Sequence, residues 1–358
     1  NELLAKELMA QGHNVTIYTF SLQYPSFLFP GTSQYSNDPA PKDLNILVKI
    51  NSINPFNWFK VGNEIKKARP DLVITRFWIP FMGPCFGTIL RRIKTNHHTK
   101  VICIADNIIP HEKRPGDALF TRYFIKPVDG FITMSENVNK DLKSFSLNKP
   151  SLVAPLPLLD NFGEKLTKEQ ARKNLGIDTS PLIVLFFGFI RKYKGLDILF
   201  DAAKILKDQG KLQHIKFLIA GEFYGDRKVY DDQISELGIA DNLIMRTEFI
   251  ENDDVKNYFC AADVVIQPYR NATQSAVTPI AYHFEIPMIV TNVGGLPALV
   301  PDGKVGLVAE PDAASLAEKI AEYFSKGEAF FTPHLIEEKK KYSWLKFTES
   351  IFSLANMK

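Results

Sequence analysis

Short apolar runs alternate along most of the chain with segments whose apolar residues recur at helical spacing. Strands that alternate with helices form parallel sheets covered by helices on both faces, and ligands bind beyond the carboxyl ends of such strands. The pattern therefore predicts an α/β fold of doubly wound sheets. The predicted strands are Val15–Phe20, Leu44–Ile50, Leu72–Arg76, Val101–Ala105, Gly130–Thr133, Ile183–Phe187, Lys216–Ala220, Asn242–Arg246, Val264–Gln267 and Met288–Thr291.

Helical spacing fills most of the intervals and the end of the chain. A helix comes before any strand, which is unusual for a doubly wound sheet, so we expect that a first strand and the loop after it are missing from this sequence. Prolines and a glycine between Pro25 and Pro41 predict a long loop of the kind that shapes binding sites. The predicted helices are Glu2–Ala10, Trp58–Ala68, Met82–Ile93, one near Phe120, one from Ser135, Leu196–Lys207, Tyr230–Leu237, Val255–Ala261, Ser275–Phe284, Ala314–Phe324, Leu335–Lys341 and Trp344–Leu354.

A chain of 358 residues is long for one core and predicts two domains, at about 150 residues each. Prolines 150, 155 and 157 indicate a linker. We expect an N-terminal domain at 1–152, a C-terminal domain at 153–340, and a last helix at 341–358 that crosses back to the first domain.

Composition places the chain among globular proteins, with 45% hydrophobic and 23% charged residues. No apolar run reaches the roughly 18 residues of a membrane span. Three cysteines among apolar neighbours predict buried, reduced thiols and a cytoplasmic location. They are Cys85, Cys103 and Cys260.

Charge is uneven, because residues 1–150 carry 19 Lys and Arg against 12 Asp and Glu. The clusters Lys66–Arg69 and Arg91–Lys94 could attract an anionic membrane surface or an acidic acceptor, or could simply be solvated helix faces. No pattern of interleaved aromatic and basic residues indicates a nucleic acid partner.

The stretch Leu182–Leu199 combines a strand, a basic loop and a helix. Glycines at 188 and 195 bound the loop, which carries Arg191, Lys192 and Lys194. Glycine lets backbone approach a ligand closely, and cations beside a helix amino terminus can hold phosphate oxygens. A solvated loop is the alternative that spacing alone leaves open.

Four segments then resemble, in order and spacing, the retaining glycosyltransferases of family four, and the resemblance covers nearly the whole chain. It implies the GT-B fold, in which two Rossmann-like doubly wound domains face a central cleft. The second domain of this family holds a nucleotide-sugar, the first holds the acceptor, and no metal or other cofactor is needed. The family also keeps a first strand and a glycine-rich loop that this sequence lacks. The four segments are Gly188–Gly195, Ile219–Glu222, Ala261–Tyr269 and Thr291–Pro297.

The resemblance assigns roles to the basic loop. Lys194 matches the family lysine that contacts the donor diphosphate, and Arg191 is expected to replace an arginine that usually stands where this chain has Phe189. Gly188 and Glu222 are expected at the donor as well. Without a metal, these cations would stabilise the leaving diphosphate.

Two family glutamates are missing. Counted back from Pro287, their positions hold Ala272 and Ile280, whose side chains cannot accept a hydrogen bond. Related enzymes with a similar run suggest that the donor is held by the neighbouring residues, although a plain helix cap is the alternative. These residues are Thr273, Gln274, Ser275, Ala276 and Val277.

In the first domain, Asp106 stands where relatives have a histidine that faces the donor sugar, while His111 and Glu112 keep the family pattern. Asp106 could bind a sugar hydroxyl or accept the acceptor's proton, but only if a cation or a proton shares its charge. Both Asp106 and His111 are candidate catalytic residues, and a structural histidine in a loop is the alternative for His111.

The sequence is therefore expected to encode a metal-independent retaining hexosyltransferase of cell-envelope or exopolysaccharide synthesis. Its partners would be a nucleotide-diphosphate sugar and a glycan, lipid-linked or small-molecule acceptor, in the cytoplasm or peripherally on the inner face of the membrane. The alternatives are a non-catalytic nucleotide-sugar-binding protein and a nucleotide-sugar epimerase.

Overall fold

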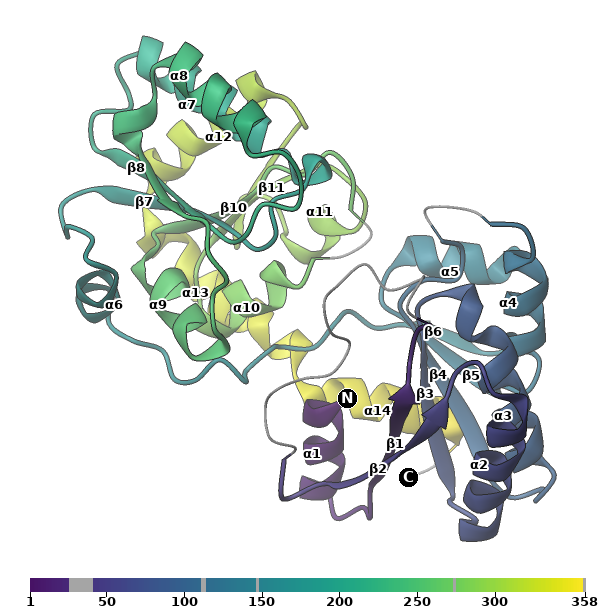
Figure 1. The fold of residues 1–358 in the computed structure, drawn as a ribbon. Helices are drawn as coiled ribbons and strands as arrows, with labels where there is room; N and C mark the ends of the chain where they lie inside the picture. The colour runs from purple at the N-terminus through teal and green to yellow at the C-terminus, as the bar shows by residue number, and fades with distance from the viewer. Residues whose placement is uncertain (26–40, 111–113, 146–147, 273–274, 357–358) are drawn as a thin grey trace. The chain divides into compact units, whose positions relative to one another are not determined.

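The protein is described by a computed structural model that covers residues 1–25, 41–110, 114–145, 148–272 and 275–356. Contacts divide the chain into two compact units, residues 1–155 together with 344–358, and residues 156–343 (Figure 1). Most of the predicted loop between Pro25 and Pro41 lies outside the described residues. Each unit is described by itself below.

The described strands of the first unit all pair in parallel. They form a two-stranded sheet of β1 and β2 and a four-stranded sheet with the order β3-β4-β5-β6. Their bounds are β1 Thr16–Leu22, β2 Asn45–Asn51, β3 Leu72–Phe77, β4 Lys100–Ala105, β5 Gly130–Thr133 and β6 Ser151–Val153.

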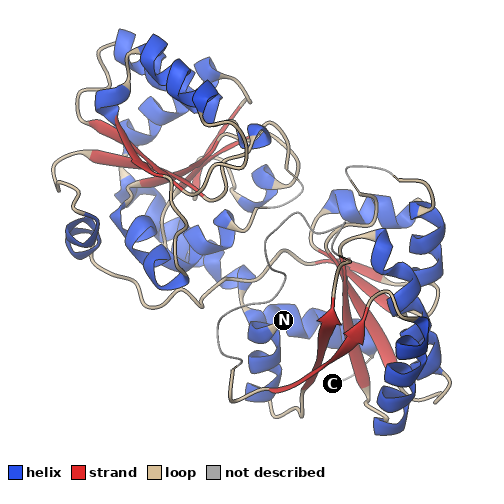
Figure 2. Ribbon diagram, in the orientation of Figure 1, coloured by secondary structure: helices blue, strands red, loops and turns tan. Residues whose placement is uncertain are grey.

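Helices of the first unit build a core against the strands and surround them (Figure 2). Apolar residues of α2, α3, α4 and α5 join one cluster with β3, β4 and β5. The last helix, α14, contacts β4, β5, β6 and α1, so residues from both ends of the chain belong to this unit. The bounds are α1 Glu2–Ala10, α2 Pro55–Ala68, α3 Gly83–Lys94, α4 Asp117–Ile125, α5 Glu136–Lys143 and α14 Trp344–Ala355.

The second unit contains one parallel sheet with the order β12-β11-β10-β7-β8-β9. Its inner strands are mostly apolar and mostly buried, as expected for a sheet covered on both faces. The bounds are β7 Leu182–Phe187, β8 Ile215–Ala220, β9 Leu243–Arg246, β10 Val264–Gln267, β11 Met288–Thr291 and β12 Gly306–Ala309.

Two hydrophobic clusters lie on the two faces of this sheet. One cluster includes α6, α9, α10 and α13, and the other includes α7 and α12 with partly buried residues of α8. This is the doubly wound arrangement that the sequence pattern predicts. The bounds are α6 Lys168–Leu175, α7 Leu196–Asp208, α8 Lys228–Leu237, α9 Val255–Ala261, α10 Val277–Phe284, α11 Leu296–Leu299, α12 Ala313–Lys326 and α13 Glu328–Lys339.

The sequence pattern misses four elements. The proline-rich segment expected as a linker contains β6, and α6, α11 and β12 are absent from the predicted list, as are the first turns of α13. Helix α13 begins at Glu328 and not at Leu335, because it tolerates Pro333 in its interior. There the Thr332 hydroxyl donates to the Glu328 carbonyl at 3.0 Å. The prediction of buried free thiols is confirmed for all three cysteines.

Candidate functional site

The strand order of the second unit places a topological switch point between β7 and β10. From β7 the chain proceeds to β8 and β9 on one side, whereas β10, β11 and β12 follow one another on the other side (Figure 1). Ligands of open α/β sheets bind where the order reverses, outside the carboxyl ends of the strands. The loops that follow β7 and β10 are therefore the first place to look for a site.

The loop after β7 packs closely against the loops after β8 and β10, and three glycines lie at these contacts. Gly188 has φ +94°, and a Cβ built on it would lie 2.9 Å from Lys194 Nζ. A Cβ on Gly221 would lie 2.6 Å from the Gly188 carbonyl oxygen, and one on Gly195 would lie 2.0 Å from the Pro268 carbonyl oxygen. Because no side chain fits there, the backbones after β7, β8 and β10 converge at the switch point.

Lys194 lies in a short 3-10 turn, Lys192–Lys194, just before α7. Burial, together with the nearby positive charge of Arg191, lowers the pKa of Lys194 to about 8. Its Nζ lies 5.6 Å from the centre of the Tyr269 ring. Among the described residues no carboxylate pairs with this ammonium. A largely desolvated cation without an anionic partner favours an anionic ligand.

Arg191 extends over the ring of Tyr224, with its guanidinium carbon 4.1 Å from the ring centre. The two segments that carry these residues are bonded to each other. The Ile190 N–H donates to the Glu222 carbonyl at 2.7 Å, and the Tyr224 N–H donates to the Ile190 carbonyl at 2.9 Å. Glu222 therefore lies beside the basic loop, and its backbone oxygen helps to hold the loop in place.

The loops after β7 and β10 are joined by an ion pair that the sequence analysis missed. Arg270 donates to both carboxylate oxygens of Asp197 at 2.6 Å, and its N–H donates to the Tyr193 carbonyl at 2.7 Å. Asp197 is in the first turn of α7 and Arg270 follows β10. Opposite charges that follow two strands of one parallel sheet can indicate an ion pair, but only when the two strands are known to be neighbours in the sheet.

The run that was expected to hold the donor is partly described. Ser275 is buried, and its hydroxyl accepts from the Val277 N–H at 3.2 Å and lies 3.3 Å from the Tyr269 hydroxyl. The bond to the Val277 N–H holds the backbone just before α10, whose N-cap position is Ala276 and receives no side-chain cap. Ala276 is exposed just before α10, and Val277 is buried as its first residue. Thr273 and Gln274 lie outside the described residues.

The two positions where the family has glutamates are apolar and buried. Ala272 and Ile280 belong to the hydrophobic cluster under the sheet. A Cβ built on Gly294 would lie 1.5 Å from the Ala272 carbonyl oxygen, so the loop after β11 packs directly on this residue. Neither side chain can bind a ribose or a sugar hydroxyl.

In the first unit, Asp106 follows β4 and pairs with Arg76 near the end of β3. The Arg76 Nε donates to Oδ2 of Asp106 at 3.1 Å, and a terminal nitrogen of Arg76 donates to Oδ1. The Asp106 N–H donates to the Phe77 carbonyl at 2.9 Å. Arg76 supplies the cation that a functional Asp106 was expected to need, and sequence analysis missed it. His111 and Glu112 lie outside the described residues.

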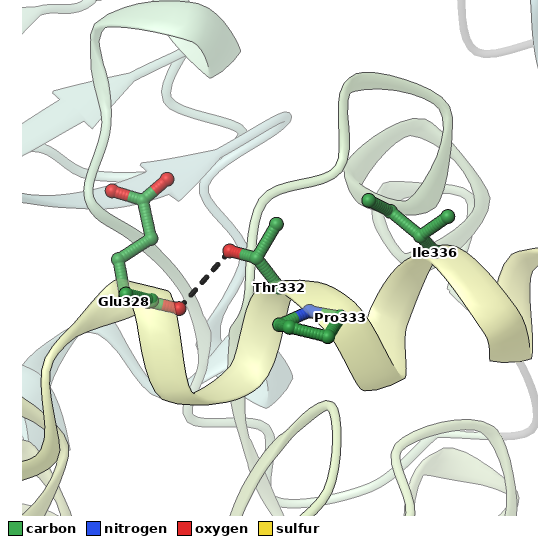
Figure 3. A pocket seen from close by; sticks show the side chains of 5 residues that line it. Glu328, Thr332, Pro333 and Ile336 are labelled. Carbon is green, nitrogen blue, oxygen red and sulfur yellow. Dashed lines mark hydrogen bonds between the residues drawn. The ribbon is translucent and has the colours of Figure 1, made fainter.

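A separate hollow of about 670 Å³ lies along α13 (Figure 3). Glu328, Thr332, Pro333 and Ile336 are among the residues that line it, and none of the predicted site residues is. Within the described part of the chain, no group of three His, Cys, Asp or Glu side chains could hold a metal ion. None of its helices is long and apolar enough to cross a membrane.

Two sequence families match the chain, one in each half. The family described as "Glycosyltransferase Family 4" matches residues 2–155, and the family described as "Glycosyl transferases group 1" matches residues 167–340. Together the two matches cover most of the chain.

Curated relatives are similar to part of the chain. The D-inositol 3-phosphate glycosyltransferase of Mycolicibacterium gilvum is 30% identical over 193 residues, which are 51% of this chain and 41% of that relative. TuaC of Bacillus subtilis, named provisionally as a teichuronic acid biosynthesis glycosyltransferase, is 25% identical over 75% of this chain and 64% of its own. The match therefore spans less than two thirds of each of these relatives.

Solved structures share the whole fold. HepE from Anabaena, whose structure contains UDP, aligns with a TM-score of 0.70 and 14% identity over 87% of this chain and 86% of its own. At this identity the likeness establishes the fold alone. It is the GT-B fold, with two Rossmann-like units, as the sequence predicts.

Proposed function

Because the chain belongs to the group 1 glycosyl transferases, we propose that it transfers a sugar from a nucleotide-diphosphate donor to an acceptor hydroxyl with retention of configuration. The observation that carries this proposal is Lys194, a desolvated cation without an anionic partner among the described residues. It lies at the switch point of the second unit's sheet, above Gly188 and beside Arg191.

In the proposed reaction, Lys194 and Arg191 bind the donor diphosphate and stabilise the negative charge that grows as it departs. The amino terminus of α7 begins directly after Lys194 and Gly195, and its positive end adds to this stabilisation. Because two side-chain cations and a helix terminus supply the charge, the proposed reaction needs no metal. An oxygen of the leaving diphosphate then accepts the acceptor's proton on the same face of the sugar.

We propose that Asp106 orients a sugar or acceptor hydroxyl, with His111 as a second candidate beyond the described residues. The Arg76 guanidinium neutralises Asp106 and fixes the direction of its oxygens. This makes a carboxylate tolerable near an anionic donor. The Asp106 carboxylate thus keeps lone pairs that can accept from a hydroxyl.

We propose a cytoplasmic enzyme, attached peripherally to the inner face of the membrane, that acts on a glycan, lipid-linked or small-molecule acceptor. The relative named for teichuronic acid biosynthesis supports an acceptor of cell-envelope or polysaccharide synthesis, and the one named for D-inositol 3-phosphate supports a small-molecule acceptor. Uridine is the first donor base to test, because HepE was solved with UDP.

A non-catalytic nucleotide-sugar-binding protein is the second candidate. It is favoured by Ala272 and Ile280, which are buried and apolar where the family has two glutamates. The transferase and the binding protein would share the donor site, and they differ in whether the sugar is transferred from the donor to an acceptor.

Thermal unfolding with uridine, guanosine, adenosine and thymidine diphosphates tests the donor site. A ligand at about a hundred times its dissociation constant adds about 2.7 kcal/mol of stability. We expect one diphosphate to stabilise the wild type and Lys192→Ala, an exposed lysine of the same turn, but not Lys194→Ala. If no diphosphate stabilises the folded wild type, the proposal is wrong. Release of free nucleoside diphosphate from the matching nucleotide-sugar then separates the enzyme from the binding protein.

A further inference from the structure

The amino-terminal end of α2 exposes an unusual amount of aromatic surface. Phe56 is 88% exposed and Phe59 is 53% exposed, and Ile53, just before the helix, is 48% exposed. Phe56 and Phe59 are three residues apart on a helix and therefore lie on the same face. We call these two phenylalanines and Ile53, which precedes the helix by two residues, the α2 tip.

The α2 tip is held firmly in place. The Asn54 side chain caps the helix by accepting from the Asn57 N–H at 3.3 Å. The Asn57 side chain donates to the Lys49 carbonyl at 2.9 Å, and Trp58 Nε1 donates to the Asn51 carbonyl at 2.8 Å. These bonds tie the first turn of α2 to the end of β2. The phenylalanines therefore stand in water on a rigid element, not on a fraying end.

The opposite face of α2 explains why the phenylalanines cannot turn inward. Val61 and Ile65 are buried in the core of the first unit, and Gly62 allows α2 to approach α3 closely. A Cβ on Gly62 would lie 2.8 Å from the Arg92 Cβ. Because this packing fixes the rotation of the helix, Phe56 and Phe59 remain on the outer face.

The same outer face is positively charged. Lys60 and Lys67 are exposed at helical spacing from Phe56, and Arg92 of α3 donates to the Asn63 side chain beside them. The acidic residue of α2, Glu64, is already bound by Lys49 at 2.5 Å and by the Tyr18 hydroxyl at 3.1 Å. Helix α3 contains no acidic residue. Glu64 is also within electrostatic reach of Lys60, so the acidic residues of these two helices compensate the lysines near the α2 tip only in part.

We propose that the α2 tip docks on the surface of an anionic lipid bilayer. Exposed aromatic side chains beside lysines are what such a surface binds, because the rings enter the interface while the ammonium groups reach the phosphates. An acidic protein partner would match the charge but gives no reason for two rings to project outward from a charged face. The proposal rests on the peripheral membrane attachment proposed above and identifies the α2 tip as the surface that makes this attachment. It does not depend on the transfer reaction.

Sedimentation of the full chain with vesicles tests the proposal. We expect binding to vesicles of phosphatidylglycerol and phosphatidylcholine, weaker binding as salt rises, and little binding to phosphatidylcholine alone. The variant F56S/F59S should lose about tenfold or more in vesicle affinity. K60Q/K67Q should lose affinity for the anionic vesicles only.

The matched control is Phe330→Ser, which removes a 46% exposed phenylalanine from α13 of the other unit. It should bind vesicles like the wild type. Unchanged binding by F56S/F59S, an equal loss in the control, or no binding by the wild type would each overturn the proposal. So would a wild-type dimer that F56S/F59S converts to a monomer while vesicles have no effect. Nucleoside diphosphate binding by the same proteins reports on the proposed function separately, since that site lies in the other unit.

Discussion

Arg76 and Asp106 are joined by two hydrogen bonds from one guanidinium to one carboxylate, although thirty positions separate them in the chain. Arg76 lies near the end of β3, and Asp106 follows β4 directly. Because β3 and β4 are parallel neighbours in register, their ends meet at one edge of the sheet. The pair gives the first unit a carboxylate whose charge is compensated and whose direction is set.

Breaking this pair should destabilise the protein. The side chains are 33% and 22% exposed, so solvent screens the pair only in part. We expect Arg76→Gln to lower the free energy of unfolding by about 1–2 kcal/mol, because it leaves a half-buried carboxylate without its cation. Denaturant unfolding of Arg76→Gln, Asp106→Asn and the double variant measures this. A double variant as unstable as the sum of the two single ones would show that the two residues do not interact.

Lys194 should make stability depend on pH in the alkaline range. Burial and Arg191 lower the pKa of Lys194 to about 8 from the ordinary 10.5, so the folded state releases this proton at lower pH than the unfolded state. The charged lysine therefore costs stability below about pH 8, and this cost disappears as pH rises toward the unfolded pKa. Lys194→Met should be more stable than the wild type at pH 7, by about 1–3 kcal/mol, and this gain should shrink by pH 10.

Unfolding of both proteins by urea at several pH values measures this difference. Lys192→Met serves as the control, because Lys192 is an exposed residue of the same turn. A constant difference between Lys194→Met and the wild type from pH 7 to pH 10 would show that the pKa of Lys194 is not lowered by folding.

Tyr224 should position Arg191 for the donor. A guanidinium over an exposed aromatic ring is worth about 0.5–1 kcal/mol. We expect Tyr224→Ala to weaken nucleoside diphosphate binding by about two- to fivefold, because Arg191 loses the surface that holds it. Tyr224→Phe keeps the ring and should bind like the wild type. Calorimetric titration distinguishes the variants, and an equal loss in both would point to the Tyr224 hydroxyl instead of its ring.

Replacing Asp263 should lower the free energy of unfolding more than replacing any other acidic residue of the second unit. It is buried, and its carboxylate accepts from Lys168 at 2.6 Å, from Arg172 at 2.8 Å and from the Ile183 N–H at 2.6 Å. Removing it leaves the buried Arg172 guanidinium without its counterion. We expect Asp263→Ala to cost about 3–5 kcal/mol of unfolding free energy.

The exposed pair of Arg227 and Asp231, one helical turn apart, is the natural control for Asp263. Asp231→Ala should cost less than about 1 kcal/mol, since exposed ion pairs contribute little. Equal losses in the two variants would mean that the Asp263 pair is no stronger than a surface pair.

The sequence by itself determined the alternation of strands and helices and the basic loop between Gly188 and Gly195. These features are local. A strand or a helix of ordinary length can be recognised from the period of its apolar residues, and a glycine-bounded loop can be recognised from its composition. Strand β6, with three residues, is too short to show a period and was missed for the same reason. Strand β12 was also missed, although it is as long as β10 and β11, which the pattern predicts. The predicted start of α13 was wrong because the helix contains Pro333, and a proline usually ends a helix.

Only the tertiary structure decided which charges meet. Arg270 pairs with Asp197, and Arg76 pairs with Asp106. Both ion pairs form because the strand order places the segments that carry the two partners side by side. Lys194 lacks a partner among the described residues because the folded loop carries it away from every described carboxylate and partly out of water. Strand order depends on contacts between segments that are far apart in the chain, and no local period records those contacts. The pairing and the desolvation of the site's charges therefore had to come from the fold.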